Sequence, residues 1–326
     1  MNLNWNICAS GRKGVLHESQ FEFPPVIMSN QSNSIPVGEG PRGIAISSDG
    51  ARVFVCNYIS GNVSVIDTRS KKVIRTIAVE RYPQNITLSP DGKRAYVTNY
   101  GSGSVSVIDT ETYEMGNVTV GRHPWGVVVS RDGKQVYVTV RQDKEWLAII
   151  DARTYAVSRV QGLPSPSISV DISQDDSRLY ISSTNPPGAP YQDALTVIDS
   201  KTFKVIDIIK TAQYPSAVTV SPDGREVYVV GQDARKLTVL DTRSSITRHF
   251  DFVTCEGKIV FGEKNAYAVD QTNKEIVEVN TATYEIIRRV PIPGACEPYD
   301  MVLDRHRAYI SDYQNDEVHI VDLPQA

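Results

Sequence analysis

The chain has few cysteines and no long apolar run. None of its four cysteines forms a CxxC pair, so the sequence predicts neither a disulfide framework nor a zinc or haem attachment motif. No stretch approaches the roughly 18 apolar residues that a membrane-spanning helix needs, and residues 1–15 lack the apolar run of a secretory signal. We therefore expect a cytoplasmic protein with no membrane partner.

Basic charge is not in excess either. The 326 residues include 34 Lys and Arg against 38 Asp and Glu, which gives a formal net charge of −4 and predicts no nucleic-acid partner. The chain contains no P-loop, HExxH, GxSxG or EF-hand loop. A GxGxxG pattern at Gly38–Gly43 joins two predicted strands and is followed by no helix, so it does not indicate a dinucleotide site.

The apolar residues favour strands over helices. Valine outnumbers leucine 40 to 11, and the apolar runs are short, β-branched and interrupted by Gly, Asp, Asn and Pro. With 40% apolar and 22% charged residues, the composition is typical of a globular protein with a large core. We expect an all-β fold.

A short acidic motif recurs seven times along the chain. SVIDT or a close relative places an Asp or Asn at intervals of 42, 42, 48, 42, 39 and 42 residues, at Asp67, Asp109, Asp151, Asp199, Asp241, Asn280 and Asp322. A second anchor about 26 residues upstream is proline in five repeats, at Pro41, Pro83, Pro124, Pro215 and Pro298. Ser167 and Glu256 take its place in the other two. These anchors predict seven repeats.

Each repeat is expected to contain four short strands. The second repeat shows this best, with strands at 84–89, through Tyr96, at 105–109 and near Val118. Asp-Gly turns recur between the first two strands, where Gly tolerates the positive φ of a tight hairpin, at Gly50, Gly92, Gly133 and Gly224. Four short antiparallel strands every ~40–45 residues are typical of a propeller blade.

The segment Tyr96-Val97-Thr98-Asn99 and its variants, for example Phe54-Val55-Cys56-Asn57, resemble the YVTN repeat family of seven-bladed β-propellers. The resemblance covers roughly residues 35–323. It implies an all-β, seven-bladed propeller with four antiparallel strands per blade. We expect residues 1–20 to form an N-terminal extension, residues 21–326 to form a single propeller domain, and the protein to be a monomer.

The two ends of the repeat array are complementary. The seventh repeat ends after its third strand, at Asp322-Leu323, whereas Ile35–Gly38 resembles the end of a fourth strand. The N-terminal segment should therefore complete the last blade and close the ring, which removes the open sheet edge at the junction.

Loops on one face of a propeller surround the central channel. They join strand four to the next strand one, and strand two to strand three, and a rigid scaffold can present binding groups there. Just after the anchor the repeats carry Arg42, Gln84, Trp125, Ile168, Ser216, Gly257 and Tyr299. Just before it they carry Gly40, Tyr82, His123, Pro166, Tyr214, Cys255 and Glu297. This mouth is the predicted functional site.

The first functional hypothesis is the binding of a small molecule or peptide through aromatic area and a few polar groups. The candidate ligand-binding residues are Arg42, Tyr58, Tyr100, Trp125, Arg141, Tyr191 and Tyr313. The two arginines suit a carboxylate or phosphate. Salt bridges explain these arginines equally well, the possible partners being Glu256, Glu297, Asp270 and Asp312.

The alternative is an enzyme of the lyase, hydrolase or isomerase kind. The resemblance permits it, because similar propellers include lactonases and antibiotic-ring lyases that work at the channel mouth. His123 would be the acid or base, with an ordinary exposed loop histidine as the plain alternative. Glu256 or Glu297 would be its counterpart, and Tyr82 or Tyr299 a proton donor. No cofactor is predicted, although a divalent metal at the mouth is left open.

Two further features have structural alternatives. Cys255-Glu256 and Cys296-Glu297 fall in corresponding loops of adjacent repeats, which fits two structural thiols, a disulfide or a soft-metal site. Polar residues at the end of strand two suit turn caps as well as a binding site, namely Asn57, Asn99, Asp270 and Asp312.

Overall fold

The computed structural model describes residues 33–141, 146–161, 163, 167–184, 193–231, 235–305 and 307–324, which belong to one compact unit. The predicted N-terminal extension and its boundary after residue 20 lie outside these residues, as does Tyr191. Within the described ranges the chain has no helix long and apolar enough to cross a membrane.

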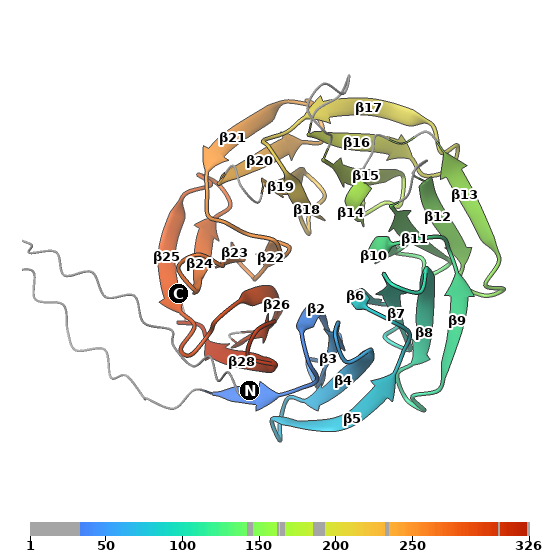
Figure 1. The fold of residues 1–326 in the computed structure, drawn as a ribbon. Helices are drawn as coiled ribbons and strands as arrows, with labels where there is room; N and C mark the ends of the chain where they lie inside the picture. The colour runs from blue at the N-terminus through green and yellow to red at the C-terminus, as the bar shows by residue number, and fades with distance from the viewer. Residues whose placement is uncertain are drawn as a thin grey trace, which may run out of the picture. The chain divides into compact units, whose positions relative to one another are not determined.

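Seven antiparallel sheets of four strands, the blades, surround a central channel (Figure 1). Blade 1 contains β2 (Pro41–Ile46), β3 (Arg52–Asn57), β4 (Asn62–Asp67) and β5 (Lys72–Ala78). Blade 2 contains β6 (Pro83–Leu88), β7 (Arg94–Asn99), β8 (Ser104–Asp109) and β9 (Met115–Thr119). Blade 3 contains β10 (Pro124–Val129), β11 (Gln135–Val140), β12 (Trp146–Asp151) and β13 (Val157–Gln161).

The remaining blades repeat this order. Blade 4 contains β14 (Ser167–Ile172), β15 (Arg178–Ser183), β16 (Ala194–Asp199) and β17 (Val205–Lys210). Blade 5 contains β18 (Pro215–Val220), β19 (Glu226–Gly231), β20 (Lys236–Asp241) and β21 (Thr247–Asp251). Blade 6 contains β22 (Val260–Phe261), β23 (Asn265–Asp270), β24 (Glu275–Asn280) and β25 (Ile286–Pro291). Blade 7 contains β26 (Pro298–Asp304), β27 (Arg307–Asp312), β28 (Glu317–Asp322) and β1 (Ser34–Pro36).

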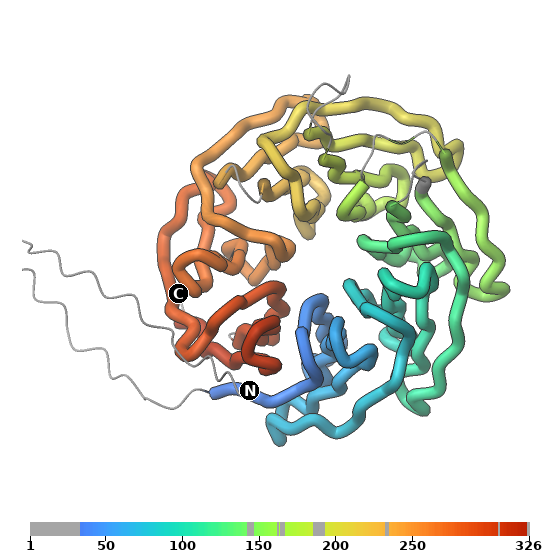
Figure 2. Tube along the Cα trace, in the orientation of Figure 1, coloured from blue at the N-terminus to red at the C-terminus, as the bar shows by residue number. Residues whose placement is uncertain are grey.

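The ring closes as the sequence predicts. The short strand β1 pairs antiparallel with β28, with Ile35 opposite Val318, and so supplies the fourth strand of blade 7. Figure 2 shows the described chain passing once around the ring, so that its blue start lies beside its red end. Both β28 edges are therefore paired, which leaves no open third strand at the junction.

The turns on the face opposite the mouth repeat closely. In blade 2, Ser89 Oγ donates to Asp91 Oδ1 at 2.5 Å and accepts the Arg94 N–H at 3.0 Å, while Gly92 has a φ of 70°. Asp109, at the end of β8, accepts the N–H groups of the next turn. The same contacts recur in other blades, so the recurring aspartates are structural, as we expect for a residue type needed seven times.

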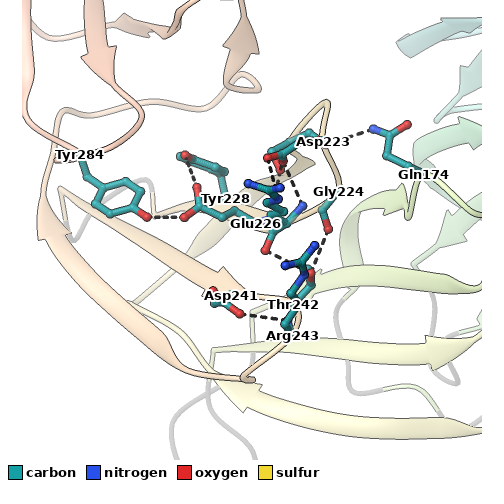
Figure 3. Close-up of polar contacts among 11 residues, drawn as sticks. Gln174, Asp223, Gly224, Glu226, Tyr228, Asp241, Thr242, Arg243 and Tyr284 are labelled. Atoms are coloured by element: carbon teal, nitrogen blue, oxygen red, sulfur yellow. Dashed lines mark hydrogen bonds and ion pairs between the residues drawn. The ribbon is translucent and has the colours of Figure 1, made fainter.

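The core consists of apolar clusters between neighbouring blades, each with side chains from both blades of its interface. The third residue of strand two is an aromatic ring in every blade, and Phe54 and Tyr309 are fully buried. Figure 3 shows one such interface, where Glu226 of blade 5 accepts the Tyr228 hydroxyl at 2.7 Å and the Tyr284 hydroxyl of blade 6. Packing of this kind fixes each blade relative to the next.

Candidate functional site

The innermost strand of most blades has a β-bulge next to the mouth. The pairing of strands one and two shifts register just after the anchor in six blades, as between Pro41 and Ile44 and between Pro124 and Val127. Such a bulge turns one side chain out of the ladder. A hydroxyl on strand two fixes it, because Thr98 Oγ1 donates to the carbonyl oxygen of Trp125 in the next blade at 2.9 Å.

The same kind of hydrogen bond links other neighbouring blades, including blades 7 and 1 at the ring junction. Ser311 Oγ of blade 7 donates to the Arg42 carbonyl oxygen of blade 1 at 2.6 Å, and Thr139 Oγ1 donates to the Ile168 carbonyl oxygen at 2.8 Å. The residues after the anchors are therefore held by their own backbones. We call them the inner ring.

Blade 6 corrects the sequence alignment. A side chain at Gly257 would lie 2.7 Å from the Tyr299 carbonyl oxygen of the next blade, just as one at Gly126 would lie 2.7 Å from the Ile168 carbonyl oxygen. Gly257 is therefore the equivalent of Gly126, and the residue before it belongs to the inner ring.

Glu256 thus takes the place that the sequence alignment gave to Gly257, and Cys255 stands at the anchor. The alignment was wrong because blade 6 has one additional residue, Lys258, and its first strand is reduced to β22. The corrected inner ring comprises Arg42, Gln84, Trp125, Ile168, Ser216, Glu256 and Tyr299.

Arg42 lies among aromatic rings. Its guanidinium carbon is 3.9 Å from the ring centroid of Tyr58 and 4.9 Å from that of Tyr313. Its Nη1 donates to Gln84 Oε1 at 2.7 Å, and Gln84 Nε2 donates to the Tyr299 hydroxyl at 3.2 Å. The arginine is therefore held in place by stacking and by a neutral amide, which leaves its charge uncompensated by these contacts.

The structure decides one alternative that the sequence left open. Asp270 pairs with Arg289 at 3.1 Å, and Asp312 pairs with His319 at 2.9 Å. Among the described residues, neither Arg42 nor Arg141 has a carboxylate within the 4.0 Å of an ion pair. The salt-bridge explanation of these two arginines is therefore wrong.

A cavity of about 230 Å³ opens beside the inner ring. Arg141 lies at its wall with its guanidinium carbon 4.8 Å from the Trp125 ring centroid. Its lining comes from blades 3 to 7 and includes Trp125, Arg141, Ile168, Tyr214, Glu256 and Tyr299. The closed ring thus brings together side chains that are up to 174 positions apart, from 125 to 299.

Tyr299 remains protonated in this setting. Burial and the negative charge of Glu256 raise the pKa of its hydroxyl far above the usual value, against a smaller opposing effect of Arg42. Burial likewise raises the pKa of Tyr58, again opposed by Arg42. Both hydroxyls are therefore hydrogen-bond donors at neutral pH.

An outer rim of aromatic rings surrounds the inner ring. Tyr82 stacks on Tyr58 with centroids 4.9 Å apart, and His123 stacks on Tyr100 at 4.5 Å. Tyr100 also meets Trp125 edge-on at 5.6 Å. Tyr82 is 44% exposed, and His123 is exposed too. These residues extend the aromatic surface outward from the cavity.

Glu297 lies apart from the cavity lining. Its side chain is exposed, and its N–H donates to Asp312 Oδ1 at 2.9 Å. Asp312 is fully buried and also accepts the Cys296 N–H at 2.7 Å. Asp312 therefore fixes the loop before Pro298, and its role is that of a structural cap.

The cysteines are separate thiols. Cys255 is buried and donates to the Gly257 carbonyl oxygen at 3.1 Å, whereas Cys296 is partly exposed, and both are free. Burial raises the pKa of the Cys255 thiol to about 12, so it is neither a nucleophile nor a ready metal ligand at neutral pH. Within the described ranges, no three His, Cys, Asp or Glu side chains are grouped for metal binding.

The predicted candidates thus fall into three groups. Trp125, Arg141, Glu256 and Tyr299 line the cavity. Arg42 lies beside them and its guanidinium contacts the rings of Tyr58 and Tyr313. Tyr82, Tyr100 and His123 form the rim, while Glu297 is exposed and Tyr191 lies outside the described residues. Sequence reasoning did not select Gln84 and Tyr214, although their columns next to the anchor already held selected residues.

Comparisons with known proteins agree with this fold. The family model described as "Lactonase, 7-bladed beta-propeller" matches residues 27–161, which is less than half of the chain. No curated protein sequence matches the chain significantly. Neither comparison identifies the YVTN repeat family in particular.

Several solved structures are similar. Hydrazine synthase from Kuenenia stuttgartiensis has a TM-score of 0.78 at 20% identity, over 92% of this chain and 99% of that one. Virginiamycin B lyase from Staphylococcus aureus has a TM-score of 0.74 at 17% identity, over 91% of this chain and 97% of that one. At these identities the likeness shows a common propeller fold and no common activity.

Proposed function

We propose that this propeller binds a small organic anion with an apolar or aromatic body at the channel mouth. The observation that carries the proposal is the pair of arginines, Arg42 and Arg141, which face the mouth without a carboxylate partner among the described residues. A partly buried guanidinium held by neutral groups is prepared to receive a carboxylate or phosphate.

The walls of the cavity fit the rest of such a ligand. Trp125 and Tyr214 offer aromatic area, and Ile168 offers an apolar contact. A volume of about 230 Å³ is below the roughly 300–1,000 Å³ typical of clefts for drug-sized molecules. The ligand is therefore a small molecule, or the anionic end of a larger one such as a peptide.

Calorimetric titration tests this proposal with benzoate as the probe and benzamide as its neutral counterpart. We expect benzoate to bind. Arg141→Ala should raise the Kd for benzoate roughly 10–100-fold, because a charged hydrogen bond is lost. Arg81→Ala removes an exposed arginine from the same face and is the matched control. Equal affinity for benzamide, or an equal loss in the control, contradicts anion recognition.

A second candidate function is catalysis in the same cavity. Glu256 and Tyr299 both line it, and the charge of Glu256 acts on the Tyr299 hydroxyl. In the hydrolysis of a lactone, Glu256 would take a proton from water as the water oxygen bonds to the carbonyl carbon. Tyr299 would give its proton to the oxygen released when the ring C–O bond breaks. The product carboxylate would then face the arginines.

Turnover of a lactone panel distinguishes the two candidates. Catalysis predicts that Glu256→Gln abolishes turnover, since an amide cannot act as the base, while benzoate binding stays within about threefold of the parent. Glu297→Gln, which removes an exposed carboxylate outside the cavity, serves as the control. Turnover that survives Glu256→Gln rules out this mechanism but leaves the binding proposal intact.

A further inference from the structure

In three blades an arginine of the outermost strand occupies the same register beside the seam, whereas Ser158 and Asp207 occupy it in blades 3 and 4. Arg75 pairs opposite Val65, Arg248 opposite Val239 and Arg288 opposite Glu278. Arg75 and Arg288 each reach the following blade. The guanidinium carbon of Arg75 is 5.3 Å from the Tyr113 ring centroid, and Arg288 Nη1 donates to the Pro324 carbonyl oxygen at 3.2 Å.

Blade 2 has a glycine in this register. Gly116 pairs opposite Val107, as Arg75 pairs opposite Val65. A Cβ at Gly116 would meet no atom within 4 Å, and its backbone is outside the left-handed region. Neither crowding nor conformation therefore requires glycine here. Glycine weakens a strand and often marks a bulge, a bend or a place where a ligand or another backbone segment approaches closely.

The missing side chain leaves a cavity of about 400 Å³ between blades 2 and 3. Its wall in blade 3 is Tyr155, which is 40% exposed. Its equivalent Tyr284, in the seam of blades 5 and 6, is only 7% exposed and bonds to Glu226 (Figure 3). The guanidinium carbon of Arg94 is 5.6 Å from the Tyr155 ring centroid, yet the Tyr155 ring stays far more exposed than that of Tyr284.

The charges around the cavity suit a cation. Asp109 and Glu114 line it together with one arginine, Arg94, whose Nη1 donates to the Ala152 carbonyl oxygen. The seam of blades 1 and 2 has the same arrangement, with Arg52 bonded to the Thr110 carbonyl oxygen, and it still holds Arg75 as a second guanidinium. The seam of blades 1 and 2 therefore shows that a second guanidinium fits a cavity of this kind.

We propose that this cavity receives an arginine side chain of a partner protein. Its guanidinium would stack on Tyr155, as that of Arg75 stacks on Tyr113, and would pair with Asp109 and Glu114. The cavity lies at the turn joining β8 and β9, on the face opposite the channel mouth, so this interaction is independent of the ligand proposed for the mouth.

Binding of a defined peptide tests the proposal by NMR. The probe is acetyl-Gly-Arg-Gly-amide, and the citrulline peptide is its neutral counterpart. We expect the Tyr155 ring signals to shift for the arginine peptide alone, with a Kd in the millimolar range. The affinity is weak because one cation–π contact and exposed ion pairs contribute little binding free energy. Equal binding of the citrulline peptide, or no shift by about 20 mM arginine peptide, overturns the proposal.

A matched pair of variants locates the site. Gly116→Arg fills the cavity with the side chain found in other seams, and we expect it to weaken peptide binding at least tenfold. Ser158→Arg adds the same charge at the equivalent exposed position of blade 3, opposite Ile149, and should leave binding unchanged. Retained binding in Gly116→Arg, or an equal loss in both variants, overturns the assignment.

Stability supplies a second readout that needs no ligand. Because Gly116→Arg would reproduce the contact of Arg75 and remove a glycine from a strand, we expect its Tm to rise by about 1–3 °C. A lower Tm overturns the claim that this seam accepts a guanidinium.

Discussion

The mouth of the propeller and the opposite face are both built from the loops between strands but differ in how far those loops repeat. On the opposite face, Ser-x-Asp turns recur in five blades, as in the contacts of Ser47 with Asp49 and of Ser221 with Asp223. At the mouth the inner ring holds seven side chains of different types, from Arg42 to Tyr299. Repetition marks what every blade needs to fold, and divergence marks what the ring needs once.

The mouth loop of blade 7 is held by a buried carboxylate, that of Asp312. Replacing Asp312 by Ala removes the acceptor for the Cys296 and Glu297 N–H groups and leaves His319, which is 2% exposed, without its partner. We expect a loss of about 3–5 kcal/mol in the free energy of unfolding, measured by chemical denaturation. Asp251→Ala, at a side chain 93% exposed, is the control and should change it by less than about 0.5 kcal/mol. Comparable losses in the two variants would contradict the structural role of Asp312.

The opposite face should be the acid-sensitive one. Backbone and serine hydrogen bonds lower the pKa of Asp132 and of Asp175 to about 2. Because the pKa is about 3.9 in the unfolded chain, the stabilisation is complete above that value and is lost as the pH falls toward 2. We expect the Tm to fall by roughly 5 °C between pH 6 and pH 3.

A double variant sharpens this expectation. Asp132→Asn with Asp175→Asn removes two of the titrating groups, so its Tm should depend less steeply on pH over the same interval. An unchanged pH dependence would show that the acid sensitivity arises elsewhere, for example from Asp312, whose pKa hydrogen bonds lower despite its burial.

The smallest effect is expected at Glu297. Its backbone N–H is bound but its carboxylate is exposed, so Glu297→Gln should change the free energy of unfolding by less than about 0.5 kcal/mol. Benzoate affinity should also stay the same, because Glu256 and not Glu297 lines the cavity. A tenfold change in affinity measured by calorimetry would return Glu297 to the candidate site.

The fold was predictable because its signals repeat. Seven Asp or Asn anchors, the Asp-Gly turns and the complementary ends of the array fix the blade count and the closing strand β1 without any knowledge of side-chain contacts. The aromatic residue in strand two of each blade is a consequence of the same repetition.

The site was predictable only in part because it depends on the departures from the repeat. The alignment misplaced Glu256 by one position, since the additional Lys258 and the Cys255 anchor interrupt the pattern in blade 6. Asp270 pairs with Arg289 and Asp312 contacts His319, which takes these acids away from Arg42 and Arg141, and no spacing in the sequence reveals such a choice of partners. No sequence pattern distinguishes Gly116 either, because its register opposite Val107 and its open surroundings are visible only in the structure.

The pairing of β1 with β28 also constrains the order of events during synthesis. β1 leaves the ribosome first, but its partner follows about 280 residues later, which takes roughly 15–60 s at 5–20 residues per second. Throughout that time Ile35 has no sheet to join, and the blades already made must stay soluble as an open arc. Closure of the ring therefore requires two chain segments that are synthesised about 280 residues apart.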